Sequence, residues 1–172
     1  MNGFDIRDGR VRDLEAIDAL YPSAFPEEDL RPLVRRLLGD TPGVLSLVAV
    51  AGPALTGHAV FTPCSVKDDA VALLGPLAVA PAWQKRGVGT ALVQEGLERQ
   101  RSAGVARVLV LGDPAYYGRF GFAAERSVAP PFAIPEAWRA AWQSIALRED
   151  ARGLRGRLAV PPAWNKRALW AP

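Results

Sequence analysis

Six residues near the middle of the chain have types and a spacing suited to holding a phosphate group. The run Gln84-Lys85-Arg86-Gly87-Val88-Gly89 follows an apolar segment and a proline, and it precedes a helical pattern. The first turn of a helix has N–H groups without intrahelical partners, and the helix dipole adds partial positive charge there. Glycine at 87 and 89 leaves the backbone open to a ligand, while Lys85 and Arg86 add charge. The segment therefore predicts a cradle that a pyrophosphate would fit.

Two other phosphate-binding patterns do not match these residues. A Walker loop ends in Gly-Lys-Ser/Thr, and the chain has no Gly-Lys pair. A dinucleotide fingerprint needs Gly or Ala as its sixth residue, with an acidic residue about 20 positions on, whereas Leu92 stands at that sixth place. For the six residues alone, a surface glycine turn before an ordinary helix remains the alternative.

A second segment, Val108 to Phe122, offers a group that could donate a proton. An apolar run there is followed by a short aromatic helical turn and a Gly-Phe pair. A phenol such as that of Tyr117 can donate a hydrogen bond to a developing thiolate, whose conjugate acid has a pKa near ~8.5 against about 10 for tyrosine. The alternative is that Tyr116 and Tyr117 pack the helix against a sheet.

The two segments together resemble one enzyme family. Gln84, Gly87 and Gly89 match the Q/R-x-x-G-x-G/A signature of GNAT acetyltransferases, and Tyr117 stands four residues before the glycine of Gly-Phe, as the family's tyrosine does. The order LGPLAV, QKRGVG and GDPAYYGRFGF is similar to a subgroup of predicted bacterial GNAT N-acetyltransferases. Residues 73–122 account for most of this resemblance.

The resemblance implies acetyl-CoA as the cosubstrate, no metal, and Tyr117 as the general acid. It also implies that Leu77 and Val79 contact the pantetheine arm through their main chain. Many GNAT proteins have an Asn seven residues before the Tyr, but here that residue is Val110, which puts the depth of Tyr117 in the site in doubt. The expected cofactor-binding residues are Leu77, Ala78, Val79, Gln84, Lys85, Arg86, Gly87, Val88, Gly89 and Thr90.

No residue stands out as a general base. A carboxylate could remove the amine proton through water, and Glu27, Glu28 and Asp113 are candidates, although each also suits a helix start. His58, the single histidine, lies in a strand pattern and is expected to be structural, as is Cys64. The tryptophans at 138, 142 and 164 suit core packing better than an acceptor pocket.

Composition agrees with a compact enzyme. The 172 residues are 49% hydrophobic and 23% charged, which suits one domain with a real core. The net charge of +3 comes from scattered arginines without a basic block, so nucleic-acid binding lacks support. The single cysteine, the N-terminus without a signal-peptide pattern and the lack of a run of about 20 apolar residues predict a soluble, cytoplasmic protein.

The elements that must position these residues alternate between strands and helices. Expected strands are 4–7, 44–51, 55–62, 71–79, 105–111 and 154–160. Expected helices are 13–20, a second one from Pro26 through Leu38 with Gly39 as its stop, 87–102, and a short one over 138–145.

These patterns predict an α/β (α+β) protein with the GNAT fold: a single mixed, curved β-sheet with helices on both faces, forming one domain over residues 1–172. The expected reaction is direct transfer of an acetyl group from acetyl-CoA to a primary amine of a small molecule or peptide. Neither nucleic acid nor a membrane is expected as a partner, and a homodimer stays open. A non-catalytic acyl-CoA-binding or interaction module is the alternative.

Overall fold

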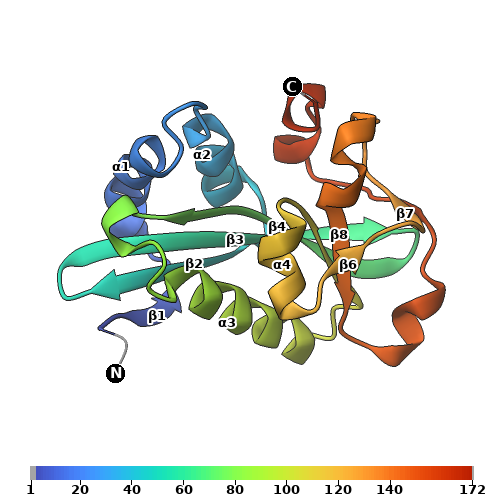
Figure 1. Cartoon of the computed structure of the whole chain (residues 1–172), viewed down its shortest axis with the longest axis horizontal. Coiled ribbons are helices and arrows are strands. Elements are labelled where there is room, and N and C mark those ends of the chain that lie inside the picture. The colour runs from blue at the N-terminus through green and yellow to red at the C-terminus, as the bar shows by residue number, and fades with distance from the viewer. Residues whose placement is uncertain (1–2, 172) are drawn as a thin grey trace. The chain divides into compact units, whose positions relative to one another are not determined.

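The computed structural model of the chain describes residues 3–171 (Figure 1). Its helices are α1 (Leu14–Ala24), α2 (Arg31–Asp40), α3 (Val88–Ser102) and the single-turn α4 (Pro114–Tyr117). Its strands are β1 (Asp5–Asp8), β2 (Leu45–Ala51), β3 (Ala54–Val66), β4 (Asp69–Val79), β5 (Arg107–Leu111), β6 (Ala123–Ala124), β7 (Val128–Ala129), β8 (Trp142–Ala146) and β9 (Gly156–Arg157). Short 3-10 helices connect several of them.

Seven strands are hydrogen-bonded in the order β1-β2-β3-β4-β5-β8-β6. The β1–β2, β2–β3, β5–β8 and β6–β8 pairs are antiparallel, and β4 pairs with β5 in parallel. The expected mixed sheet with flanking helices is thereby confirmed. In addition, β7 and β9 form a two-stranded parallel sheet that the sequence patterns do not indicate.

The chain groups into two units, Met1–Phe61 with Gly75–Gly96, and Thr62–Leu74 with Leu97–Pro172. The candidate site residues are divided between the units: the segment 84–90 belongs to the first unit, and Tyr117 belongs to the second. The expectation that residues 1–172 form one domain stays a prediction.

In the first unit, helices cover both faces of β3, as Figure 1 also shows. On one face, Gly57 lies so close to α3 that a Cβ there would approach Val88 Cγ1 to 2.7 Å, and Gly96 of α3 lies directly against the ring of Phe61. On the other face, His58 contacts Tyr21 of α1. Because successive residues of a strand point to opposite faces, the two small glycines let α3 approach without displacing α1.

The side chain of His58 is buried in a polar chain beneath α1. Its Nδ1 lies 2.7 Å from the hydroxyl of Tyr21, and its Nε2 lies 2.8 Å from Oγ of Ser46 on β2. Burial lowers the pKa of His58 to about 4, although the carboxylate of Asp13 acts in the opposite direction. The expectation of a structural histidine is confirmed, because both ring nitrogens are occupied by interior hydroxyl groups.

We expect the stability of the protein to fall between pH 7 and pH 5 through His58. The unfolded chain protonates this histidine near pH 6.5 and the folded chain only near pH 4, so the unfolded state binds more protons in this window. The loss of unfolding free energy should be about 1 to 2 kcal/mol over these two pH units. Urea titrations at several pH values measure it. His58→Gln should flatten the slope, and an equal slope in the variant would contradict the assignment.

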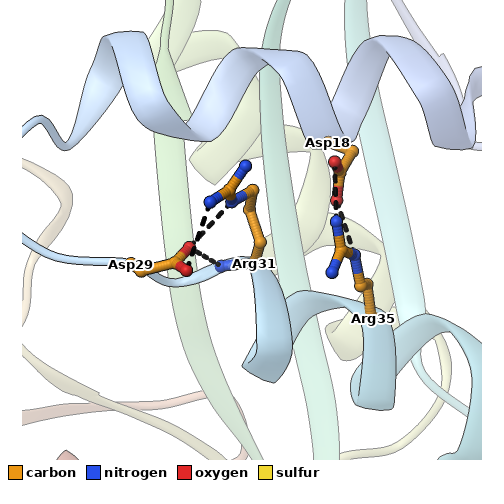
Figure 2. A network of polar contacts seen from close by, with 4 residues as sticks. All are labelled: Asp18, Asp29, Arg31 and Arg35. Carbon is orange, nitrogen blue, oxygen red and sulfur yellow. Dashed lines mark hydrogen bonds and ion pairs between the residues drawn. The ribbon is translucent and has the colours of Figure 1, made fainter.

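One of the two ion pairs in Figure 2 connects α1 and α2. Arg35 of α2 donates through Nε and Nη2 to the two carboxylate oxygens of Asp18 on α1, at 2.7 and 2.9 Å. Arg31 pairs with Asp29 in the turn before α2. A groove of about 420 Å³ lies between the helices, and all three of these α1 and α2 side chains line it. Because charges of both signs line it, Glu15 and Asp18 against Arg31 and Arg35, the groove shows no preference for a cation or an anion.

The start of α2 differs from the expected helix over 26–38. The helix begins at Arg31 and ends at Asp40, so Glu27 and Glu28 lie in a turn and not in a first helical turn. The carboxylate of Asp29 accepts the Arg31 N–H at 3.2 Å, and Pro32 follows in the first turn. An Asp two residues ahead of a helix and a proline in its first turn together favour this later start.

The expected helix over 138–145 is also wrong in its second half. Residues Glu136–Ala141 form a 3-10 helix, but Trp142–Ala146 is strand β8, which pairs with β5 on one edge and β6 on the other. A short apolar run does not distinguish helix from strand by its periodicity, and here two neighbouring strands decide the outcome. The expected last strand over 154–160 shortens to β9 and a bridge between Ser65 and Ala159.

The second unit contains a buried ion pair that sequence reasoning did not identify. Nη1 of Arg107 donates to Glu125 at 2.6 Å, and Nη2 donates to the carbonyl oxygen of Ala151 at 2.5 Å. Glu125 also accepts from the hydroxyl of Ser144 and from the N–H groups of Ser127 and Val128. The network ties β5 and β8 to the segment that leaves β6. No spacing in the sequence indicates it, because Arg107 and Glu125 belong to separate elements.

Candidate functional site

The amino end of α3 offers free backbone amides. The first hydrogen bond of this helix joins the N–H of Ala91 to the carbonyl oxygen of Gly87 at 3.0 Å. The N–H groups of Val88, Gly89 and Thr90 therefore precede the hydrogen-bonded ladder of α3, where the helix dipole is positive. The sequence 84–90 thus forms the loop and helix start that a phosphate cradle needs.

The backbone at the entry to α3 depends on glycine. Gly87 has φ +86°, in the left-handed region, and Lys85 has φ +61°. A Cβ added at Gly87 would meet no other protein atom within 4 Å, so the space beside Gly87 is open. Free amides next to a glycine without a side chain are features of helix starts that bind phosphate.

Some side chains of the loop before α3 hold it in place, and others extend from it. Nε2 of Gln84 donates to the carbonyl oxygen of Val79 at 3.2 Å, which ties the loop to the end of β4. The guanidinium of Arg86 stands 4.2 Å from the ring centre of Trp83. Lys85 is exposed. Gln84 thus positions the loop, while Lys85 is the side chain best placed to add charge near an anion.

The end of β4 presents a backbone edge. Its register with β5 comprises Ala72, Leu73 and Leu74, whereas β4 itself continues to Val79. Ala78 is buried among side chains of α1, α2 and β2, and by alternation Leu77 and Val79 point to the other face. One edge of β4 pairs with β5 up to Leu74. Among the described residues, no strand pairs with this same edge at Leu77–Val79. Such an edge can bind the amide groups of an extended ligand.

Tyr117, at the end of α4, packs closely against other residues of the second unit. Its ring contacts Tyr116 and Phe122 at centroid distances of 5.0 and 5.6 Å. A Cβ at Gly112 would clash with Cε2 of this ring, so the strand-to-helix turn before α4 needs glycine there. The hydroxyl of Tyr117 has no hydrogen-bond partner in the part of the chain that the structure describes, and it is not among the fully buried polar atoms. It is therefore free to meet a ligand.

Burial raises the pKa of Tyr117 well above its usual value, and the neighbouring Tyr116 acts in the same direction. The phenol therefore stays protonated at physiological pH and keeps its O–H donor. Tyr116 is more open, and Arg119 stands 4.5 Å from its ring centre. The two adjacent tyrosines thus differ in environment, which a sequence pattern does not show.

The three candidate general bases occupy different structural environments. Asp113 caps α4, because its Oδ1 accepts the N–H of Ala115 at 2.9 Å, so the expected helix start is confirmed. Glu27 and Glu28 are exposed in the turn between α1 and α2. No geometry among the described residues selects one of these carboxylates for proton removal.

The remaining residues considered from the sequence are structural. Burial raises the pKa of Cys64 to about 12, so its thiol is not a nucleophile. Trp142 and Trp164 are buried and both contact Trp170, which the sequence analysis did not consider. Their indole N–H groups donate to the Val128 carbonyl oxygen and the Thr62 hydroxyl. Core packing is confirmed for these two tryptophans.

Residues 3–171 contain neither a cluster of metal-ligand side chains nor a helix that could span a membrane. No three His, Cys, Asp or Glu side chains gather as metal ligands would. None of the helices in this range is both long and apolar enough to cross a membrane.

Comparison with known proteins places these features in a family. The family model described as "Acetyltransferase (GNAT) family" matches residues 14–122, which include the cradle and Tyr117. Among curated relatives, the uncharacterized N-acetyltransferase YjhQ of Escherichia coli K12 is 36% identical over 155 residues, covering 85% of this chain and 86% of the relative. The uncharacterized N-acetyltransferase YhbS of the same strain is 37% identical over 113 residues, covering 64% of this chain and 68% of the relative.

Solved structures agree with this assignment. The crystal structure of YhbS from Escherichia coli in complex with CoA superposes with a TM-score of 0.83 at 30% identity, covering 95% of this chain and 92% of that one. A GNAT family acetyltransferase from Brucella melitensis in complex with acetyl-CoA gives a TM-score of 0.74 at 30% identity, covering 93% and 97%. The chain therefore belongs to the GNAT family and is an N-acetyltransferase.

Proposed function

We propose that this N-acetyltransferase uses acetyl-CoA and transfers its acetyl group directly to a primary amine of a small molecule or peptide. The observation that carries the proposal is the entry to α3, where free amides of Val88, Gly89 and Thr90 border the open space beside Gly87. The cofactors named for the structures from Escherichia coli and Brucella melitensis, CoA and acetyl-CoA, support the choice of ligand.

In this proposal the pyrophosphate of acetyl-CoA binds the amides at residues 87–90, with Lys85 and Arg86 adding charge. The pantetheine arm pairs with the backbone edge at Leu77–Val79, next to Ala78. An extended ligand that carries amide groups suits a strand edge, because the strand supplies both N–H donors and C=O acceptors. Gln84 holds the loop against Val79 and so keeps the two binding elements in register with each other.

The proposed chemistry needs one protein proton donor. The lone pair of the neutral amine attacks the thioester carbonyl carbon, a C–N bond forms, the C–S bond breaks, and the amine proton leaves to water. The thiolate takes up a proton, for which the phenol of Tyr117 is the donor, and the phenolate then regains a proton from water. Burial raises the pKa of Tyr117, which reduces the driving force for full transfer, but it raises the pKa of a thiol in the same surroundings as well. A proton shared between the phenol and the departing thiolate is therefore sufficient to stabilise the leaving group.

Ligand specificity tests this proposal. The cradle has neither the Walker lysine nor the acidic ribose-binding residue, so acetyl-CoA and CoA should stabilise the protein, and ATP and NAD should not. At a ligand concentration about 100 times Kd the gain is about 2.7 kcal/mol, or roughly 5–10 °C in Tm for a chain of this size. Differential scanning fluorimetry measures it. A larger shift with ATP or NAD would be incompatible with the proposal.

A further inference from the structure

A cavity in the second unit has no part in the proposed acetyl transfer. It measures about 820 Å³ and is built mainly by the segment between β6 and β8, which contains β7 and the 3-10 helix Glu136–Ala141, with β9 adding one side (orange in Figure 1). This volume is in the range of pockets that hold small organic molecules. Neither the segment 84–90 nor Tyr117 lines it.

Positive charge predominates in this cavity. Three arginines line it, Arg126, Arg139 and Arg157, together with a single carboxylate, that of Glu125. Glu125 is already neutralised, because it pairs with the buried Arg107 and accepts three further hydrogen bonds. The carboxylate therefore does not offset the charge of the arginines that line the cavity.

Two of the three arginines have no carboxylate partner. Arg157 donates to the carbonyl oxygens of Pro130 and Pro131, at 3.0 and 3.4 Å, which holds its guanidinium in place while leaving its charge uncompensated. Arg126 makes neither an ion pair nor a hydrogen bond with any residue of the range 3–171. Arg139 pairs with Glu136, but both side chains are largely exposed, so water screens that pair.

The walls between these charges are apolar and aromatic. Phe132, Ile134 and the buried Trp142 line the cavity, and Arg167 stands 5.4 Å from the ring centre of Phe132. An apolar wall bordered by guanidinium groups suits a ligand that has an apolar or aromatic body and an anionic end, because guanidinium binds carboxylate and phosphate oxygens in a fork.

We propose that this cavity, the arginine pocket, is a binding site for a small organic anion: a carboxylate or phosphate monoester attached to an apolar or aromatic group. The site is separate from the acetyl-CoA cradle and does not depend on the proposed acetyl transfer.

Isothermal titration calorimetry at low salt, without acetyl-CoA, tests the arginine pocket. The probes are 3-phenylpropionate and phenyl phosphate, with the neutral 3-phenylpropanol as their matched control. We expect at least one anion to bind about tenfold or more tightly than the alcohol, and the tighter of the two anions tells a carboxylate site from a phosphate site. Equal binding of the alcohol, or no binding of either anion, would overturn the proposal.

Variants locate the binding. Arg126→Gln and Arg157→Gln should each weaken the anion by about 3- to 10-fold, since each removes one charge–charge contact near water. Arg126 is exposed and makes no hydrogen bond or ion pair with another described residue, so its variant should keep the fold even if loss of the Arg157 bonds disturbs the segment. Arg155→Gln is the matched control, because Arg155 is exposed nearby in the chain and does not line the cavity. A loss in this control equal to that in Arg126→Gln would show nonspecific attraction and refute the site.

The cradle variant Gly87→Val separates this proposal from the proposed function. Anion binding should be unchanged in that variant, because Gly87 belongs to the first unit and the arginine pocket to the second. If Gly87→Val abolished binding of the probes, the probes would have to occupy the cradle. That result would overturn the arginine pocket and leave the acetyl-CoA proposal intact.

Discussion

Replacement of Gly87 by valine should reduce acetyl-CoA affinity by more than about 100-fold while the protein remains folded. Two effects combine: φ +86° is unfavourable for a β-branched residue, and the new side chain would fill the open space beside the amides of Val88 and Gly89. Since a phosphate loses its approach to several amides at once, the expected loss exceeds that of one hydrogen bond. Calorimetric titration with acetyl-CoA measures the affinity.

Gly104→Val is the matched control for backbone strain. Gly104 has φ +79°, and a Cβ there also meets no atom within 4 Å, but it lies beyond the carboxyl end of α3. The control should lose about the same stability, on the order of 1 kcal/mol, and bind acetyl-CoA normally. Unchanged affinity in a folded Gly87→Val protein would rule out the proposed cradle, and a similar loss in Gly104→Val would attribute the effect to strain alone.

Replacement of Tyr117 by phenylalanine should slow the chemical step by about 100-fold, within the usual range for general acid catalysis. The ring that packs against Gly112 and Phe122 is retained, and the lost hydroxyl has no partner among residues 3–171, so the melting temperature and acetyl-CoA affinity should change little. The measurement needs an acceptor, found by screening amines for release of free CoA, followed by single-turnover rates.

Tyr116→Phe is the control for Tyr117. Its ring lies beneath the Arg119 guanidinium and edge-to-face with Phe120, and these contacts persist in phenylalanine, so the single-turnover rate should stay within about twofold of the parent protein. Full activity in Tyr117→Phe, or a loss that only follows a lower melting temperature, would return Tyr117 to the role of a packing aromatic.

The sequence alone predicted those features that depend on neighbouring residues. The strands at 44–51 and 71–79 and the helix from 87 to 102 follow from short-range periodicity and from glycine and proline signals, and the structure places β2, β4 and α3 within a few residues of them. The proposed cradle and the Tyr117 turn are continuous segments with family motifs, so they could be predicted without the fold. The family itself followed from those motifs.

Tertiary structure decided whatever depends on contacts between distant segments. Residues 142–146 form a strand because β5 and β6 pair with both of its edges, although the local pattern suits a helix equally well. Gly57 and Gly96 are required because α3 lies against β3, and neither glycine stands in a turn that would mark it. The pair Arg107–Glu125 and the arginine pocket likewise bring together residues that are many positions apart. A sequence pattern reports local conformational preference, whereas burial, charge pairing and cavities arise only when the chain folds back on itself.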